Sequence, residues 1–152
     1  MAHLVSIVYS PHGGEARPAE HYARVPLERT SLVVDHGIVG DRKGGRGKRQ
    51  VNVMCAEVIE ELSDENFKTA PGEMGEQLVI AGIEPSALTM GTRLKIGESA
   101  VIEVSIPRTG CGRFERIQGK LKRQAAGRLG VLATVATGGE IAVGDEVRIL
   151  AE

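Results

Sequence analysis

Two stretches of the chain, LTMGTRLKI (Leu88–Ile96) and IAVGDEVRI (Ile141–Ile149), share one pattern. In both, apolar residues alternate along the chain, a glycine turns it, and a polar pair precedes a further alternating run. A glycine in this position is a common way to turn a corner in small β-barrels. The likeness is too short to establish a duplicated fold, but it predicts a barrel-like arrangement of short strands.

The remaining segments agree with this prediction. Alternating or continuous apolar runs predict further strands, helical spacing predicts two helices, and Ser10–Gly14 has the composition of a turn. The expected strands cover residues 4–9, 32–34, 51–54, 78–81, 100–106 and 130–136, and the expected helices cover 56–62 and 112–127. We therefore expect a mostly β fold with short helices (α+β), arranged as a mixed β-barrel. A doubly wound α/β fold fits less well, because its strand–helix alternation occurs at most twice here.

Composition indicates one globular domain. The chain has 152 residues, of which 20 are glycine, while Phe, Tyr and Trp supply only 3%. Abundant glycine suits short strands joined by tight turns. Scarce aromatics argue against a single-strand nucleic-acid binder, which stacks bases on aromatic rings. The formal net charge of −1 creates no global attraction for nucleic acid or anionic lipid.

Cysteine usage and the apolar runs indicate a reducing compartment. Two cysteines are too few for a disulfide framework. The apolar run near Met1 lacks a basic flank and is too short for a signal peptide, and no run is long enough to span a membrane. We expect a cytoplasmic protein whose thiols can stay free, with no membrane partner.

Positive charge is concentrated in two stretches, 42–49 and 108–128, which hold 12 of the 19 basic residues. The glycine-rich loop from Gly40 to Gln50 combines a flexible backbone with five cations, which suits a phosphate or another oxyanion, although a solvated basic loop fits the composition as well. It lacks the Gly-Lys-Ser/Thr ending of a nucleotide-binding P-loop. Nucleic-acid binding through both basic stretches is a more distant alternative.

Cys111 is the strongest candidate for chemistry. It lies in IPRTGCGRF (Ile106–Phe114), where glycine on each side leaves the sulfur uncovered. Arg108 and Arg113 are close enough in sequence to stabilise a thiolate, and a helix beginning at Gly112 would add to this effect. Such a sulfur is a nucleophile or a soft metal ligand. A buried, inert cysteine is the alternative.

The other candidate ligands fit structural roles better. Cys55 follows an apolar run and has acidic rather than basic neighbours, which favours a core thiol. The histidines His3, His12, His21 and His36 have no zinc-ligand spacing with one another or with either cysteine.

The order of motifs resembles the MOSC domain, named for the C-terminal part of molybdenum-cofactor sulfurases and also found alone in small bacterial proteins. The resemblance runs from about Leu4 to Ile149, and we expect residues 1–152 to form a single such domain. The motifs, in order, are GIVGDR (Gly37–Arg42), RQV (Arg49–Val51), PGEMGE (Pro71–Glu76) with Leu78, then Gly91, Gly97, Arg108 and Cys111.

The resemblance implies a fold similar to the β-barrel domain of pyruvate kinase and binding of the molybdenum cofactor (molybdopterin), a pterin dithiolene bearing a phosphate. It implies that Cys111 is a sulfur carrier or a molybdenum ligand, as in relatives that handle sulfur or reduce N-hydroxylated substrates. The residues implied in cofactor binding are Asp41, Arg42, Lys43, Arg49, Glu76, Arg108 and Arg113. We expect no pyridoxal-phosphate domain in this chain, so sulfur or electrons would come from a desulfurase, electron-transfer or molybdoenzyme partner.

Three positions depart from the family pattern. Lys43 stands where relatives usually have His, Gln77 where Asn is typical, and Gly110 where Pro is typical. A glycine before Cys111 loosens the backbone that would aim the sulfur. A non-catalytic module that carries cofactor or sulfur, or that docks a partner, is therefore the main alternative to an enzyme.

Overall fold

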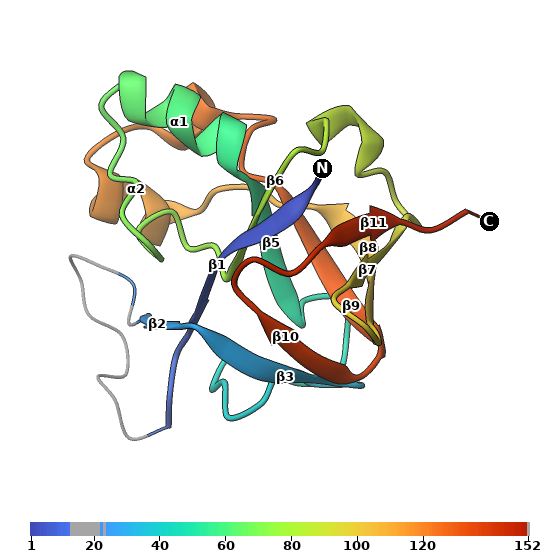
Figure 1. Ribbon diagram of the computed structural model, residues 1–152. Coiled ribbons are helices and arrows are strands. Elements are labelled where there is room, and N and C mark those ends of the chain that lie inside the picture. Colours follow the sequence, from blue (N-terminus) through green and yellow to red (C-terminus); the bar gives the residue numbers. More distant parts are fainter. Residues whose placement is uncertain (13–21, 23, 152) are drawn as a thin grey trace.

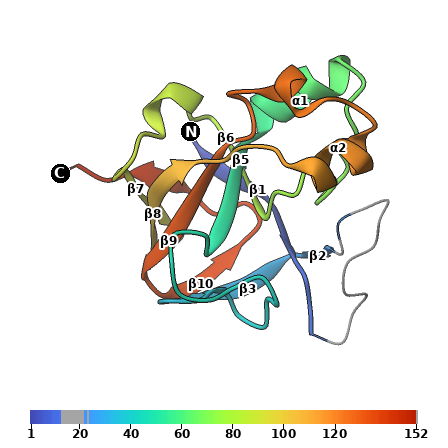
Figure 2. The ribbon, with the colours of Figure 1, turned by 180° about the vertical axis from the view of Figure 1, so that it is seen from behind.

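A computed structural model of the chain describes residues 1–12, 22 and 24–151, and it contains two β-sheets with short helices packed at one end (Figures 1 and 2). The larger sheet has eight strands in the order β11-β7-β8-β9-β5-β6-β1-β2, and the smaller has the order β10-β3-β4. The strands are β1 (His3–Tyr9), β2 (Val25–Leu27), β3 (Arg29–Val33), β4 (Gly37–Ile38), β5 (Val51–Cys55), β6 (Leu78–Ala81), β7 (Arg93–Ile96), β8 (Ala100–Pro107), β9 (Val131–Thr137), β10 (Gly139–Ala142) and β11 (Val147–Ile149). The helices are α1 (Ala56–Asp64) and α2 (Gly112–Gln118), with the 3-10 turns η1 (Pro85–Ala87) and η2 (Lys122–Ala125).

Antiparallel pairing dominates both sheets. The exception is the parallel pair of β5 and β6, where Val53 lies opposite Leu78. Parallel strands need a crossover connection, and α1 lies within the segment that joins these two. The helical layer at this end of the molecule therefore begins where β5 ends.

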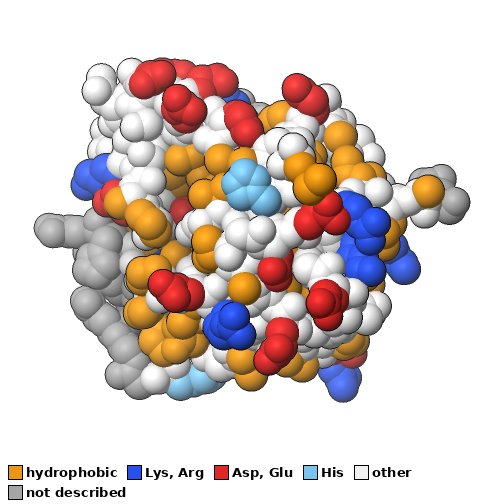
Figure 3. Space-filling view, viewed as in Figure 1, with side chains coloured by type: hydrophobic (Ala, Val, Ile, Leu, Met, Phe, Trp, Pro, Cys, Tyr) orange, Lys and Arg blue, Asp and Glu red, His pale blue; other side chains and the backbone are white. Residues whose placement is uncertain are grey.

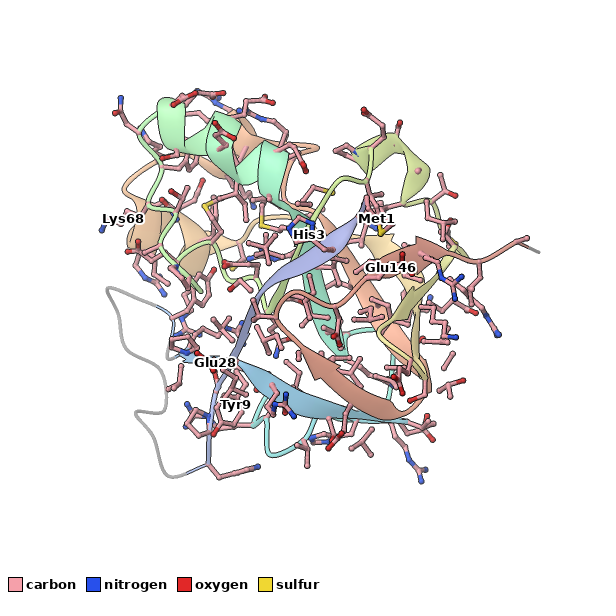
Figure 4. All side chains as sticks on the ribbon, in the orientation of Figure 1. Met1, His3, Tyr9, Glu28, Lys68 and Glu146 are labelled. Carbon is pink, nitrogen blue, oxygen red and sulfur yellow. The ribbon has the colours of Figure 1, made fainter. Side chains whose placement is uncertain are left out.

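The larger sheet curves into a barrel-like wall without a continuous closing ladder. Strand β1 contacts the residues just before β11, where His3 and Glu146 form an isolated β-bridge. Figure 4 labels both residues. The Leu4 N–H donates to the Asp145 carbonyl at 2.8 Å, and the Gly144 N–H donates to the Leu4 carbonyl at 2.7 Å. The predicted mostly β, barrel-like fold is confirmed.

Two hydrophobic clusters stabilise the fold. The larger lies between the sheets, and the smaller lies under the helical layer. Phe114 of α2 is fully buried in the smaller cluster, with its ring centroid 6.3 Å from that of Phe67. Complete burial of such a side chain stabilises the fold by roughly 1.5–3 kcal/mol. The smaller cluster therefore fixes α2, and with it the residues that precede Gly112.

The predicted elements are mostly found where expected. The strands predicted at 78–81, 100–106 and 130–136 correspond to β6, β8 and β9, and the helix predicted at 56–62 corresponds to α1. Gly91 and Gly144 both have positive φ, 89° and 97°, as the turn pattern requires. None of the helices in the described part of the chain has the length and apolar character to cross a membrane.

Two predictions differ from the structure. The helix predicted at 112–127 is split, because Gly119 adopts a left-handed conformation (φ 67°) that ends α2 before η2 begins. The alternating pattern that begins at Leu88 gives no strand before Gly91, because Leu88 follows η1 directly and caps it. Part of the turn predicted at 10–14, together with His21, lies outside the described residues.

Gly130 is required by a close backbone approach between β9 and β5. Its φ is +75°, and a Cβ there would overlap the Val53 carbonyl oxygen. Gly127 has a similar φ of +78° but nothing within 4 Å of an added Cβ.

We predict that Gly127→Ala lowers the free energy of unfolding by roughly 1–2 kcal/mol, the cost of left-handed backbone alone. Gly130→Ala should cost at least about 1 kcal/mol more, because the strand must also shift. Urea denaturation of both variants measures the difference. Equal losses in the two variants would show that the contact with Val53 is unimportant.

Candidate functional site

Cys111 lies at the junction of β8 and α2, held by backbone hydrogen bonds on both sides. The Arg108 N–H donates to the Gly130 carbonyl at 3.0 Å, and the Cys111 carbonyl accepts from the Glu115 N–H at 3.1 Å in the first turn of α2. The Cys111 side chain is exposed and forms no disulfide. The alternative of a buried, inert Cys111 is therefore excluded, and its thiol can meet a ligand or a partner.

The two glycines beside Cys111 differ in what surrounds them. A Cβ on Gly112 would have nothing within 4 Å, whereas a Cβ on Gly110 would lie 2.7 Å from the Lys122 Cβ and 3.4 Å from Leu129. Gly110 does not have positive φ. Its observed role is thus to let the 122–129 segment pack against the loop before Cys111, which is a steric reason for glycine where the family usually has proline.

A cluster of one tyrosine and three arginines lies next to Cys111. The Arg113 guanidinium carbon is 4.9 Å from the centre of the Tyr22 ring, and that of Arg24 is 5.7 Å from it. Arg108 forms a side-chain hydrogen bond with Tyr22, and both Arg108 and Tyr22 interact electrostatically with Cys111. We refer to Tyr22, Arg24, Arg108 and Arg113 as the arginine–tyrosine cluster.

Burial shapes the protonation of this cluster. It raises the pKa of the Tyr22 phenol, an effect that the charge of Arg108 opposes, so the phenol is neutral at physiological pH. Burial also lowers the pKa of Arg24 and of Arg108, while neighbouring acidic groups favour the charged forms. Arginine stays protonated in proteins, so the cluster keeps its cations in a poorly solvated place.

Several N–H groups of these arginines are buried and have no hydrogen-bond acceptor in the part of the chain that the structure describes. They are Nε and Nη1 of Arg24 and Nη1 of Arg108. The third Arg24 nitrogen, Nη2, donates to the Gly75 carbonyl at 3.1 Å. A buried donor left unsatisfied costs about 1–3 kcal/mol, and more when it is charged. The cluster is therefore chemically suited to an anion with several acceptor oxygens.

The turn at 72–76 forms the floor of this cluster. Glu76 is buried, and its carboxylate accepts hydrogen bonds from the Gly72 N–H at 2.8 Å and the Met74 N–H at 3.1 Å. Burial raises the pKa of Glu76, and these backbone bonds partly offset the effect. A Cβ on Gly75 would overlap the Arg108 guanidinium. Glu76 thus shapes the turn on which Arg108 rests, and binding of a cofactor by Glu76 stays a prediction.

Asp41 anchors the same floor from the other side. It is fully buried, and its oxygens accept from the Ser10 N–H at 3.0 Å and from Gln77 Nε2 at 2.6 Å. Gln77 Oε1 accepts from the Asn52 N–H, and the Asn52 side chain donates to the Gly75 carbonyl at 2.9 Å. Both Asp41 oxygens are committed within the protein, so its observed role is structural. Gln77, a departure from the family pattern, bridges Asp41 to β5.

The basic loop after Asp41 lies at the edge of the fold. Arg42 is half-buried, and its N–H donates to the Ser10 carbonyl at 2.8 Å. Lys43 and Arg49 are exposed on a loop that folds against His36, where the Gly45 N–H donates to the His36 carbonyl. The hydrogen-bonded chain through Asp41 brings the start of this loop to the floor of the cluster. Cofactor binding by Lys43 and Arg49 stays a prediction.

The arginines of the second basic stretch, 108–128, differ in what they contact. Arg128 bonds Glu61 of α1 at 2.9 Å and Glu65, the residue after α1, at 2.8 Å, and acidic side chains gather over this helix (Figure 3). The hydrogen bond to Glu65 raises the pKa of Arg128 and lowers that of Glu65. Arg128 therefore belongs to the scaffold, whereas Arg108 and Arg113 lie beside the thiol.

Tyr22 and Arg24 were not predicted as site residues, because no motif surrounds them in the sequence and only tertiary packing brings them to Arg108. Gln118 was not predicted either. It is buried, donates to the carbonyls of Lys68 and Glu73, and so connects α2 to the 68–74 segment, with Lys68 beside α2 in Figure 4.

Cys55 is buried as predicted, and burial, with Glu57 and Glu84, raises its pKa to about 11. Among the described residues, no group of His, Cys, Asp and Glu could hold a metal ion by itself.

Comparison with known proteins identifies related folds. The family model of the MOSC domain matches residues 10–148. The YuaD protein of Bacillus subtilis has a similar structure, with a TM-score of 0.75, 16% identity, and coverage of 97% of this chain and 94% of that one. YiiM from Geobacillus stearothermophilus gives a TM-score of 0.74 and 16% identity, covering 99% and 76%. YiiM from Escherichia coli gives 0.71 and 20%, covering 99% and 70%. Among curated proteins, none matched.

The glycines beside Cys111 offer a matched pair of variants. We predict that Gly110→Ala lowers the free energy of unfolding by about 1–3 kcal/mol, because the new methyl group displaces the 122–129 segment. Gly112→Ala should be neutral or stabilising by up to about 1 kcal/mol, because alanine favours a helix. Chemical denaturation distinguishes them, and a neutral Gly110→Ala would contradict the packing role.

The two thiols should react at very different rates. In native protein at neutral pH we expect a disulfide reagent such as dithiobis(nitrobenzoate) to label one thiol quickly, because Cys111 is exposed while Cys55 is buried and protonated. Cys111→Ser should abolish the fast phase, Cys55→Ser should retain it, and denaturant should expose the second thiol. A fast phase that survives in Cys111→Ser would refute this assignment.

Proposed function

This chain belongs to the MOSC domain family, and we propose that it binds the molybdenum cofactor at the arginine–tyrosine cluster, with Cys111 as the residue that carries its chemistry. Family membership supports a domain of the molybdenum-cofactor-binding type. The site residues, the reaction and the partners are our proposals from the geometry around Cys111.

One observation carries the proposal: arginine N–H groups that are buried and have no acceptor among the described residues lie next to an exposed thiol. A phosphate presents several acceptor oxygens and negative charge, which is what the free donors of Arg24 and Arg108 require. The residues present therefore fit a phosphorylated cofactor. We propose that Arg24, Arg108 and Arg113 hold its anionic end, and that Arg42, Lys43 and Arg49 contribute charge from the neighbouring loop.

Cys111 supplies the soft ligand in this proposal. A thiolate is a soft metal ligand, and the Cys111 side chain is accessible. The cofactor, when bound, supplies two-electron redox chemistry at its metal. Cys111 would hold the metal, while Arg108 would place a positive charge close to it. Reduction of an N-hydroxylated substrate, with electrons from a partner protein, is the activity that we propose for this arrangement.

A sulfur-carrier role is a second candidate, and the exposure of Cys111 favours it. The Cys111 thiolate can attack the outer sulfur of a partner's persulfide, and the partner's thiolate then leaves. Cys111 becomes the persulfide, and the partner regains its thiol. A desulfurase would be such a donor and a molybdoenzyme such an acceptor. A free surface thiol of this kind suits the cytoplasm, where thiols are kept reduced.

The decisive experiment measures molybdenum and pterin in protein purified from a host that makes the cofactor. We expect the wild type to contain both. Arg108→Lys and Arg24→Lys should lose roughly tenfold or more of the pterin, because each removes charge-assisted hydrogen bonds worth about 1.5–3 kcal/mol. Cys111→Ser should retain pterin and lose molybdenum if Cys111 is a ligand.

Arg148→Gln on β11 is the matched control, since it changes a largely exposed arginine outside the cluster. Its pterin content should equal that of the wild type. A persulfide on Cys111, found by mass spectrometry of protein purified without reductant, would support the carrier role. Folded wild-type protein without pterin would refute the proposal that this chain binds the cofactor.

A further inference from the structure

A concave site lies against the loop that precedes Cys111. It is a cavity of about 330 Å³ between residues 108–110 and the 122–129 segment. This volume falls within the range of small-molecule sites, at its lower end. We call it the 108–129 cavity; the arginine–tyrosine cluster shares only Arg108 with it.

The lining of the 108–129 cavity combines positive charge with apolar surface. Arg108, Lys122 and Arg123 contribute cations, and Ala126 and Leu129 contribute hydrocarbon. Among the residues that the structure describes, no acidic side chain lines it. Glu115, the acid nearest in sequence, is engaged with the Lys122 backbone N–H at 2.9 Å. The lining therefore favours a molecule with one anionic group and an apolar body.

The walls of the 108–129 cavity are held in place by the fold. Leu129 is almost fully buried in the cluster under the helices, and neighbouring Arg128 is fixed by Glu61 and Glu65. Gly110 packs against Lys122, as described above. A cavity whose walls are already ordered binds a small ligand with less loss of conformational entropy.

We propose that the 108–129 cavity binds a small carboxylate with an apolar body and so forms the substrate subsite beside Cys111. The carboxylate lies at Lys122 and Arg123, and the apolar body lies on Ala126 and Leu129. This inference rests on the proposed function in one respect: it takes Cys111 as the reacting residue. Binding to the cavity needs no cofactor, so it can be tested separately.

The test is a titration of cofactor-free, ¹⁵N-labelled protein followed by NMR, with benzoate as the probe. We expect saturable shifts at Gly110, Gly127 and Leu129, with a dissociation constant on the order of 1 mM for a ligand of this size. Benzamide, which keeps the ring and lacks the charge, and acetate, which keeps the charge and lacks the ring, should each bind several-fold more weakly. Equal affinity for benzoate and benzamide would overturn the proposal.

Variants assign the binding to the cavity itself. Ala126→Leu places a larger side chain in the cavity and should abolish the benzoate shifts. Lys122→Gln should weaken benzoate by about two- to fivefold, as expected for an exposed cation. Arg116→Gln, which removes an equal charge from α2 outside the cavity, should leave the affinity unchanged. Unchanged binding in Ala126→Leu would refute the assignment.

The two proposals fail in different ways. Pterin content of Ala126→Leu, measured after expression in a cofactor-making host, should equal that of the wild type. A loss of pterin in this variant would mean that the cofactor occupies the 108–129 cavity, and this would refute the proposal that the cavity binds a carboxylate. Benzoate binding without pterin in the wild type would refute the cofactor proposal alone.

Discussion

The site depends on one buried carboxylate. Asp41 accepts hydrogen bonds from the Ser10 backbone and from Gln77, and through Gln77 and Asn52 it connects to the Gly75 carbonyl. Gly75 in turn supports the Arg108 guanidinium and accepts from Arg24. Burying a carboxylate is costly unless its oxygens accept hydrogen bonds, and the partners of Asp41 also fix the strands that carry them. One constraint thus organises β1, β5 and the floor of the cluster together.

Around this floor, glycine allows close approach in two places. Gly75 leaves room for Arg108 and Tyr22, and Gly110 leaves room for the 122–129 segment. Because Gly110 lacks positive φ, its importance is steric rather than conformational. The result is two cationic sites next to the loop before Cys111: a buried one at the arginine–tyrosine cluster and an open one at the 108–129 cavity. Different ligands suit the two sites. The buried N–H donors of the arginine–tyrosine cluster suit an anion with several acceptor oxygens, whereas the exposed cations of the 108–129 cavity suit a single anionic group.

Sequence patterns located the elements that local physics controls. Alternation in β8 and β9, helical spacing in α1, and the turns at Gly91 and Gly144 are encoded within a few residues, so they were predicted correctly. The helix expected over 112–127 was too long, because the sequence pattern does not reveal that Gly119 turns left-handed. The short strand β2 was missed because Val25–Leu27 contains a proline and has no alternation.

The sequence by itself determined the family and the mostly β fold, and it placed Cys111 among arginines, since these follow from motif order and local pattern. Only the tertiary structure decided that Tyr22 and Arg24 join Arg108, that Asp41 and Glu76 are buried and accept hydrogen bonds within the protein, and that Arg128 is paired with α1. The reason is physical. Burial and hydrogen-bond partners come from segments far apart along the chain, and no local pattern specifies which donors the fold will leave unsatisfied.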